Sequence, residues 1–422
     1  MDSVQHMMGT PTKATGGVEL KKIKLLGFMD DPQVHSGFGE VSRAILAYLH
    51  STGKYDIHIC ALNWNGDEHD KEEFPYRYYH VTTDLRGLER TGNMIEKVEP
   101  DCVFILNDPD WLYEYFKRNP LLLEVPTVVY SPIDGYPFPV WWLTPFRQAT
   151  KSIVYTQWAR ECIRKKDPNI DVEVVPHGHS PAEFYPGPKE RARQLLGLNP
   201  NWFIVLRSDR NTERKDWGAT FEAFAKFAED KPEARLYAHC VWQGEHLGWV
   251  IPDLIEMFGL SERVINTKGF ADMRTTVPVQ VLNLIMNSAD VFLSTTKGEG
   301  WGLNIHHARA CGVPVIAPDN SAVPEVVGDG GELISIARRF VEPNGVVNDL
   351  CDIDHAVEIL EKLYRSPKLR EKYRQRSLLW ARKMTWNLIV PEFDRIIKEA
   401  ILKFRFSGYT EVKRWEYIQV DG

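Results

Sequence analysis

Cysteine is scarce in this sequence, and long hydrophobic runs are missing from it. The six cysteines are scattered among 422 residues, with no C-x-x-C pair and no histidine at the spacing of a metal site. Most of them lie in apolar segments, so we expect buried thiols and a reducing, cytoplasmic location. No apolar run approaches the roughly 18 residues that a membrane-spanning helix needs. These absences argue against a disulfide-stabilised domain, a zinc module and a transmembrane protein.

Repeats, low-complexity tracts and a strong excess of one charge are missing as well. The 51 Lys and Arg residues against 58 Asp and Glu residues give a net charge of −7, which argues against broad nucleic-acid binding but is compatible with a local basic groove. Hydrophobic residues at 43% and charged residues at 26% are the proportions of a globular protein. Residues 1–20 lack the hydrophobic stretch of a secretory signal, and we expect them to form a disordered leader. Nothing in the sequence indicates an oligomeric state.

From residue 22 onward, short apolar runs alternate with amphipathic stretches. The clearest helical face comprises Val41, Ala44, Ile45, Tyr48 and Leu49. Repeated strand–helix–strand units predict parallel sheets with right-handed crossovers. The runs that we expect as strands are 23–28, 57–62, 102–106, 127–130, 152–155 and 172–175, and then 203–206, 235–241, 263–267, 290–294 and 313–317.

The alternation falls into two halves. Residues 176–200 carry five prolines and several charges, which indicates a linker. We therefore expect an α/β protein with two doubly wound, Rossmann-like domains, residues 21–195 and 196–386. The last part reads as consecutive helices, and a C-terminal helix within about 387–422 is expected to pack back on the first domain. Two such domains facing each other place a ligand in the cleft between them.

A glycine-containing loop, Ser36-Gly37-Phe38-Gly39, joins the first expected strand to the first expected helix. Glycine lets the backbone approach a phosphate, and a helix N-terminus offers free amides and positive potential. The loop is not a G-x-G-x-x-G motif, because Ser42 occupies the last position. Glycine turns at strand–helix junctions are also common without a ligand, so phosphate binding and a purely structural turn both stay open.

A polar, cationic loop, residues 207–216, follows the first strand of the second half. Its position at the end of a strand places it at the cleft. Arg210 and Lys215 are candidates to clamp a diphosphate in place of a metal ion. The alternative is a solvated charged turn, which is what most charge runs are.

A second glycine-rich loop, residues 297–304, again lies between a strand and a helix. Glu299 has no packing role there that requires a carboxylate, and it is a natural acceptor for sugar hydroxyls. The amides of Gly302, Leu303 and Asn304 are placed to bind phosphate at the helix start.

In the first half, Asp134 follows an expected strand at the cleft edge. It is a candidate to orient an acceptor hydroxyl or a donor sugar, or it is an ordinary turn residue before glycine. The aromatics Tyr136, Phe138, Trp141 and Trp142 come next and form either an acceptor-stacking wall or part of the core.

The segment GEGWGLNIHHARACGVPVIAPDNSAVPEVVG, residues 298–328, resembles the signature of retaining GT-B glycosyltransferases of the large E-x7-E family, the group 1 transferases similar to sucrose synthase and glycogen synthase. The segments GFADM, which contains Phe270, and VPHGHSPAEFYP resemble the same family. The spacing of Arg210 and Lys215 matches its G-R-x-x-x-x-K-G loop, although Asp209 replaces the glycine.

This resemblance implies a GT-B fold and transfer of a sugar from a nucleotide-diphosphate sugar, UDP- or GDP-linked, to an acceptor hydroxyl. Retention of the anomeric configuration, independence of metal and the absence of a cofactor are implied with it. The catalytic candidates are Arg210, Lys215, Glu299 and Asp134. The donor-binding candidates are Gly37, Phe38, Gly39, Phe270, Gly300, Trp301, Gly302, Leu303, Asn304 and His307. The acceptor stays open and includes lipid-linked sugars, polysaccharides, proteins, small metabolites and modified nucleic-acid bases.

The sequence departs from the family at its second glutamate, where His307 stands. In the family this glutamate generally holds the ribose hydroxyls of the donor. A histidine can hydrogen-bond a hydroxyl, so His307 is either a substitute ribose ligand or a scaffold residue. In the scaffold reading, His306 and His307 line a helix with one side chain buried and the other exposed.

Two further motifs qualify the reading. Asp108-Pro109-Asp110 is similar to the D-x-D metal motif of the other glycosyltransferase fold, but here it predicts a helix start with Asp108 as the cap. Because the second glutamate is missing, a catalytically silent nucleotide-sugar-binding subunit is one alternative. Because other enzymes share this fold, an epimerase or a phosphorylase is another. The joint presence of Glu299, Arg210 and Lys215 favours an active transferase.

Overall fold

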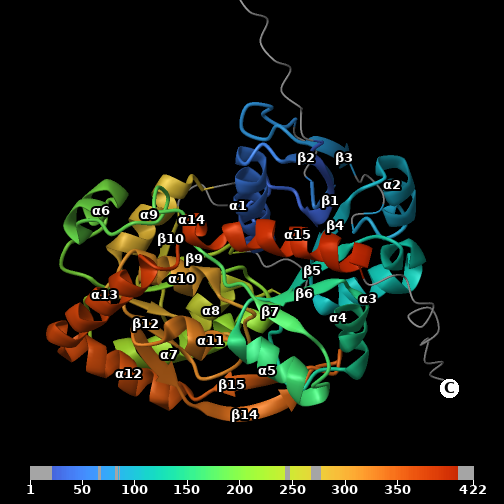
Figure 1. Ribbon diagram of the computed structural model, residues 1–422. Helices are drawn as coiled ribbons and strands as arrows, with labels where there is room; N and C mark the ends of the chain where they lie inside the picture. The colour runs from blue at the N-terminus through green and yellow to red at the C-terminus, as the bar shows by residue number, and fades with distance from the viewer. Residues whose placement is uncertain are drawn as a thin grey trace, which may run out of the picture.

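Two parallel sheets, each covered by helices on both faces, form the body of the computed structural model, which describes residues 21–64, 68–80, 84, 86–242, 248–267 and 277–406 (Figure 1). The first sheet has the strand order β3-β2-β1-β4-β5-β6-β7, and the second has β10-β9-β8-β11-β12-β13. The order reverses next to β1 in one sheet and next to β8 in the other. Ligand crevices form at such switch points in doubly wound sheets.

The first unit begins at residue 21 and ends near residue 176. Its strands are β1 (Ile23–Asp30), β2 (Tyr55–Leu62), β3 (Arg77–His80), β4 (Cys102–Leu106), β5 (Thr127–Ser131), β6 (Lys151–Val154) and β7 (Val172–Val174). Its α-helices are α1 (Gly37–Ser51), α2 (Thr91–Val98), α3 (Pro109–Arg118), α4 (Leu143–Gln148) and α5 (Gln157–Lys166).

The second unit follows the same plan. Its strands are β8 (Phe203–Ser208), β9 (Ala234–His239), β10 (Val264–Asn266), β11 (Val291–Leu293), β12 (Val315–Pro318) and β13 (Gly331–Ile334), followed by an antiparallel hairpin of β14 (Ile336–Val341) and β15 (Val347–Cys351). Its helices are α6 (Lys189–Leu196), α7 (Trp217–Ala228), α8 (Ile251–Met257), α9 (Val279–Ser288), α10 (Leu303–Ala310), α11 (Val323–Val327), α12 (Ile353–Arg365), α13 (Pro367–Ala381), α14 (Trp386–Ile389) and α15 (Pro391–Phe406).

The central strands are buried along their whole length, and are mostly apolar, because helices cover both faces of each sheet. In β4 and β5 every residue is buried, and in β8 likewise. One hydrophobic cluster fills the helix layer shared by both units, and a further cluster fills the outer layer of each sheet. The alternating pattern in the sequence therefore predicted these strands, and all eleven runs are confirmed as strands to within two residues at each end.

Four strands were not predicted from the sequence: β3, β13 and the two strands of the hairpin β14–β15. The first strand of the hairpin carries a run of exposed residues that includes Arg338 and Arg339, so it lacks the apolar run that marks the buried strands. The expected linker at 176–200 also contains α6, which packs against α9 and Asp290 of the second unit. The structure thus places residues 189–195 with the second sheet, whereas the boundary at 196 assigned them to the first.

The chain returns to the first unit at its end. Thr385 forms a parallel bridge with His179, and α15 then lies across β4 and β5, where Phe393 packs against Tyr130 and Phe104 (Figure 1). All six cysteines are buried and unpaired, as predicted. None of the described helices is long and apolar enough to cross a membrane. The expected leader, residues 1–20, lies outside the described residues.

Candidate active site

Two helix N-termini, one from each unit, meet at a cavity of about 330 Å³ between the two sheets. Gly37 of α1 lines it from the first unit, and Leu303 and Asn304 of α10 line it from the second. A Cβ on Gly37 would lie 3.3 Å from a methyl group of Leu303, so the two helix starts are in contact distance of each other. First-turn amides have no partner within a helix, so both ends present positive potential to one cavity.

The cap of α1 decides which of its amides are available. The Ser36 hydroxyl accepts a hydrogen bond of 2.9 Å from the Gly39 amide. Gly39 is buried, and a Cβ there would overlap the Val34 carbonyl. Gly39 therefore shapes the turn, while the amides of Gly37 and Phe38 are the ones left for a ligand.

Arg210 lines the same cavity from the loop after β8. Its side chain is exposed, and no ion pair within the described part of the chain engages its guanidinium. An anion that enters the cavity thus meets one uncommitted cation in addition to the two helix N-termini. His307, on α10, lines the cavity as well.

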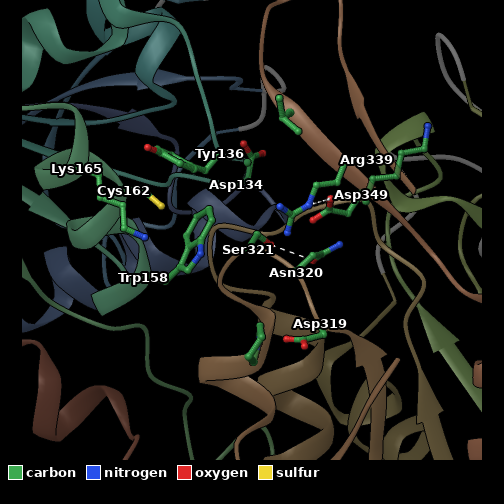
Figure 2. A pocket seen from close by; sticks show the side chains of 14 residues that line it. Asp134, Tyr136, Trp158, Cys162, Lys165, Asp319, Asn320, Ser321, Arg339 and Asp349 are labelled. Atoms are coloured by element: carbon green, nitrogen blue, oxygen red, sulfur yellow. Dashed lines mark hydrogen bonds and ion pairs between the residues drawn. The ribbon is translucent and has the colours of Figure 1, made fainter. Parts of the chain in front are cut away.

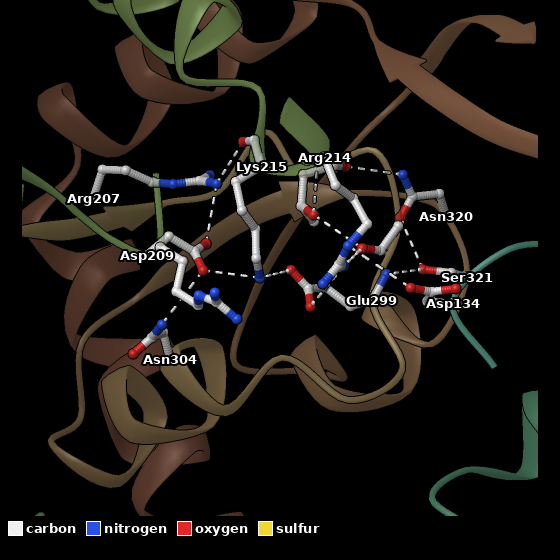
Figure 3. A network of polar contacts seen from close by, with 12 residues as sticks. Asp134, Arg207, Asp209, Arg214, Lys215, Glu299, Asn304, Asn320 and Ser321 are labelled. Carbon is white, nitrogen blue, oxygen red and sulfur yellow. Dashed lines mark hydrogen bonds and ion pairs between the residues drawn. The ribbon is translucent and has the colours of Figure 1, made fainter. Parts of the chain in front are cut away.

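Lys215 and Glu299 form a buried ion pair beside this cavity (Figure 3). The Lys215 ammonium also contacts Asp209 Oδ1 at 2.8 Å, and Arg207 contacts the other Asp209 oxygen at 3.0 Å. Burial by itself would raise the pKa of Glu299, but the charges of Lys215 and Arg214 outweigh it and hold this pKa below its usual range. Glu299 is therefore an ionised, immobilised acceptor for hydroxyl groups at neutral pH.

Arg214 is a site residue that the sequence reading missed. Its guanidinium contacts Glu299 Oε2 at 3.3 Å and Asp134 Oδ2 at 3.7 Å, and it donates to the Gly298 carbonyl (Figure 3). Arg214 thus joins a carboxylate of the first unit to one of the second. The spacing of Arg210 and Lys215 singled out Lys215 because it matches the family. No feature of the sequence around Arg214 distinguishes it from the other charged residues of the loop.

The glycines of the 298–302 loop allow the two units to approach closely. A Cβ on Gly300 would lie 2.3 Å from the Pro132 Cβ, and one on Gly298 would lie 2.1 Å from the Asp134 carbonyl oxygen. Gly302, which precedes α10, has φ +87°, in the left-handed region that favours glycine. Packing between the units and the turn into α10 both require glycine here, in addition to any contact with a donor.

His307 pairs with Glu40 across the cleft. Its Nε2 lies 3.1 Å from Glu40 Oε1 of α1, and its ring stacks on Phe184 at 3.7 Å. Burial tends to raise the pKa of Glu40, but the facing imidazole outweighs it and keeps that pKa low. His306 is fully buried and accepts from Trp301. The scaffold reading with one exposed histidine is therefore wrong, because both side chains are buried.

Asp108 stands at the helix start that the sequence predicts, directly before Pro109 of α3. Asp108 is the N-cap residue, as predicted, but its side chain makes no capping hydrogen bond. Burial, followed by the neighbouring charges of Asp134 and Asp110, raises the pKa of Asp108 to about 7. The carboxyl group therefore belongs to an acidic cluster at the ends of β4 and β5. No set of three His, Cys, Asp or Glu side chains among the described residues is grouped to hold a metal ion.

The remaining predicted residues include some whose side chains belong to the core and one that lines a cavity. Trp301 is only 4% exposed and packs on His177, so its indole is core and only its backbone can meet a donor. Of the aromatic wall, Phe138 and Trp142 are core, and Trp141 lies against Tyr113 away from the cavities. Tyr136 lines a second cavity, treated below. Phe270 lies outside the described residues.

Comparison with known proteins agrees with this geometry. Residues 188–380 match the family described as Glycosyl transferases group 1. The D-inositol 3-phosphate glycosyltransferase of Actinosynnema mirum is 29% identical over 221 residues, 51% of this chain and 49% of the relative. A GDP-mannose-dependent alpha-(1-6)-phosphatidylinositol monomannoside mannosyltransferase of Mycolicibacterium smegmatis is 27% identical over 48% of this chain and 49% of the relative. The matched part of the chain thus spans about half the length of these relatives.

Solved structures resemble nearly the whole chain. Sucrose-phosphate synthase from Thermosynechococcus elongatus superposes with a TM-score of 0.73 at 16% identity, covering 90% of this chain and all of that one. The chain has the GT-B fold. The Anabaena HepE protein, solved in complex with UDP and glucose, has a TM-score of 0.65 at 16% identity and covers 89% of this chain and all of its own. At such identities the likeness establishes the GT-B architecture and leaves chemistry to the site.

Proposed function

We propose that this protein is a glycosyltransferase that moves a sugar from a nucleotide-diphosphate sugar to an acceptor hydroxyl, with retention at the anomeric carbon and without a metal ion. The observation that carries the proposal is the convergence of two helix N-termini and the uncommitted Arg210 on one cavity between the sheets. Such an arrangement suits a diphosphate. The group 1 match over residues 188–380 and the names of the relatives support it.

Departure of the diphosphate is the step that needs most help. Breaking the bond between the anomeric carbon and the phosphate oxygen leaves positive charge on the sugar ring and negative charge on the diphosphate. Arg210 and the amides of Gly37 and Leu303 would bind that negative charge, and preorganised donors of this kind lower a barrier by several kcal/mol. Lys215 lies behind these groups, where its ion pairs with Asp209 and Glu299 fix its position.

Glu299 would position the sugar. Its carboxylate, held ionised by Lys215 and Arg214, would accept hydrogen bonds from the sugar hydroxyls and cannot rotate freely between two cations. Asp134, on the opposite unit, then faces the ring from the acceptor side. The acceptor attacks from the side that the diphosphate leaves, and the departing phosphate oxygen takes its proton. This sequence uses no separate base and gives retention.

The experiment is a donor assay on the purified full chain. UDP-glucose and GDP-mannose are supplied with and without chelator, nucleotide release is measured, and the anomeric proton of the product is followed by NMR. Release of the nucleotide diphosphate with the donor's own anomeric configuration is the expected result. Binding of the nucleotide without any turnover of either donor would favour the silent binding subunit, and inversion would contradict the same-side mechanism.

A further inference from the structure

A second cavity, of about 400 Å³, is drawn in Figure 2 and shares no lining residue with the cavity between α1 and α10. We call it the hairpin cavity, because β14 and β15 close one side of it. Small-molecule sites commonly have volumes of roughly 300–1,000 Å³. Its lining comes from the loop after β5, from α5, from the loops after β11 and β12 and from the hairpin: Asp134, Gly135, Tyr136, Trp158, Cys162, Lys165, Lys297, Asp319, Asn320, Ser321, Pro324, Arg339, Val347 and Asp349.

The hairpin is anchored to both units. The Val347 amide donates to the Pro137 carbonyl of the first unit at 2.9 Å, and the Asp349 amide donates to the Lys297 carbonyl of the second at 3.1 Å. Val346, at the start of this arm, is 2% exposed and belongs to the hydrophobic cluster of the first unit. A Cβ on Gly135 would lie 2.3 Å from Val346, so the loop after β5 and the hairpin fit tightly. The cavity is therefore a built feature with a fixed wall.

The hairpin cavity ends at the catalytic network. Asp134 lines it and contacts Arg214, which in turn contacts Glu299. Ser321 lines it as well, and its hydroxyl accepts from the Glu299 amide at 2.8 Å. The donor cavity lies on the Asp209 side of the same network. A molecule in the hairpin cavity and a donor in the other cavity would thus both reach the network around Glu299.

The chemistry of the lining selects the kind of molecule. Three carboxylates, of Asp134, Asp319 and Asp349, face three cations, of Lys165, Lys297 and Arg339, so the formal charge of the lining is zero. Two of the cations are already paired, Arg339 with Asp349 at 3.0 Å and Lys297 with Glu213 at 3.5 Å.

Two aromatic rings, of Tyr136 and Trp158, form the side opposite the hairpin (Figure 2). Hydroxyl groups both donate and accept, and the C–H faces of a sugar ring pack on aromatic surfaces. A phosphate would also meet the three carboxylates, against a single cation, Lys165, that makes no ion pair among the described residues.

We propose that the hairpin cavity binds the acceptor and that the acceptor is a neutral saccharide, stacked on Trp158 and Tyr136 with a hydroxyl directed at Asp134. This inference rests on the proposed function and adds the acceptor class to it. The hairpin, which the parallel sheets do not need for their own closure, then serves to complete the acceptor site.

The test uses ligand-observed NMR on the full chain saturated with UDP or GDP. The probes are methyl α-D-glucopyranoside, methyl α-D-mannopyranoside and methyl β-D-galactopyranoside, with D-inositol 3-phosphate as the anionic comparison. We expect at least one neutral glycoside to bind, and its affinity to fall about three- to tenfold in Trp158→Ala. Asp319→Asn, at an exposed position, serves as the second variant and should lower affinity about threefold or more. Trp141→Ala, an aromatic outside the cavity, is the matched control and should bind the glycoside normally.

The outcomes separate the inference from the function on which it rests. Nucleotide binding by wild type, Trp158→Ala and Trp141→Ala is measured on the same preparations. If the nucleotide binds while no neutral glycoside does, or if Trp158→Ala and Asp319→Asn both bind the glycoside as wild type does, the hairpin cavity is not the acceptor site and the proposed function stands. Preferential binding of the inositol phosphate would overturn the neutral class. Failure of every preparation to bind UDP or GDP would contradict the proposed function itself.

Discussion

In the first unit, the strands that end at the cleft are followed by carboxylates, whereas in the second unit they are followed by cations interleaved with carboxylates. Asp30, Asp108 and Asp134 stand at or just after the ends of β1, β4 and β5. The two units share one topology, so the difference lies in side chains at equivalent strand ends. The second unit places Arg207, Arg210, Arg214 and Lys215 at or after the end of β8 and Lys297 after β11.

This comparison suggests a division of labour. A cationic wall suits a departing diphosphate, and an acidic wall suits positive charge on a sugar ring and the hydroxyl of an acceptor. Arg214 spans the two walls through its contacts with Asp134 and Glu299. The predictions below test the two walls separately.

The largest effect is expected from Lys215→Ala. The change leaves the buried carboxylates of Asp209 and Glu299 without the cation between them. Breaking a buried ion pair costs about 3–5 kcal/mol, and loss of a preorganised charge at a reaction centre lowers turnover about 10²- to 10³-fold. Chemical denaturation and donor turnover measure the two effects. Lys226→Ala, at an exposed ion pair, is the control, and an unchanged free energy of unfolding in Lys215→Ala would contradict the buried network.

Arg210→Ala should lower turnover about 10²- to 10³-fold with no loss of stability, because the side chain is exposed and makes no ion pair among the described residues. The contrast with Lys215→Ala separates the cation that would touch the ligand from the one that holds the site together. Arg365→Ala, another exposed arginine, is the matched control. Near-normal turnover in Arg210→Ala would remove it from the diphosphate site.

The acidic wall predicts a pH effect at Asp108. Its folded-state pKa of about 7 lies above the ordinary value of 3.8, so stability is lost as the pH rises from about 4 to 7 and the full cost of ionisation persists at higher pH. Asp108→Asn removes that cost and should add on the order of 2–4 kcal/mol of stability at pH 8, with little change at pH 4. Thermal unfolding across this range is the measurement, with the exposed Asp354→Asn as control. A variant with equal stabilisation at both pH values would show that ionisation of Asp108 is not the cause.

His307 should have a smaller effect. If it holds the ribose, His307→Ala weakens binding of the nucleotide diphosphate about three- to tenfold, the worth of one hydrogen bond. His307→Glu restores the family residue but would face Glu40, so we expect it to bind no better than His307→Ala. The double variant Glu40→Gln/His307→Glu should recover affinity. Calorimetric titration of the nucleotide diphosphate into wild type and the three variants measures these affinities. Equal affinities would show that His307 has a structural role only.

The smallest effect is expected from chelation. Because cations and helix amides occupy the position of a divalent ion in this account, EDTA should leave donor turnover within about twofold. Turnover that disappears with EDTA and returns with Mn²⁺ or Mg²⁺ would overturn metal independence.

The sequence predicted what depends on local order. The strands could be predicted from their periodicity. The loops at 36–39 and 297–304, each of which leads into a helix, could be predicted because their glycines and capping residues lie within a few positions of each other. The convergence of Gly37 with Leu303 and Asn304 followed from the parallel-sheet topology, which brings strand ends together.

Individual side-chain contacts between distant segments could not be predicted from the sequence. Glu40 and His307 lie 267 residues apart, and no sequence pattern around either residue predicts that they pair. The hairpin β14–β15 has no apolar run that would predict its first strand, yet it completes the second cavity. The assignments of Trp142 and Trp301 depended on which side of a helix or loop faces the core, which composition alone does not fix.

The central claim is that the cavity between α1 and α10 binds a diphosphate through Arg210. Calorimetric titration of UDP against UMP, and of GDP against GMP, tests it most directly, with wild type and Arg210→Ala side by side. The account predicts that the matching diphosphate binds wild type at least about tenfold more tightly than its monophosphate, and that Arg210→Ala removes most of this difference. Equal affinity of wild type for the diphosphate and the monophosphate would contradict it.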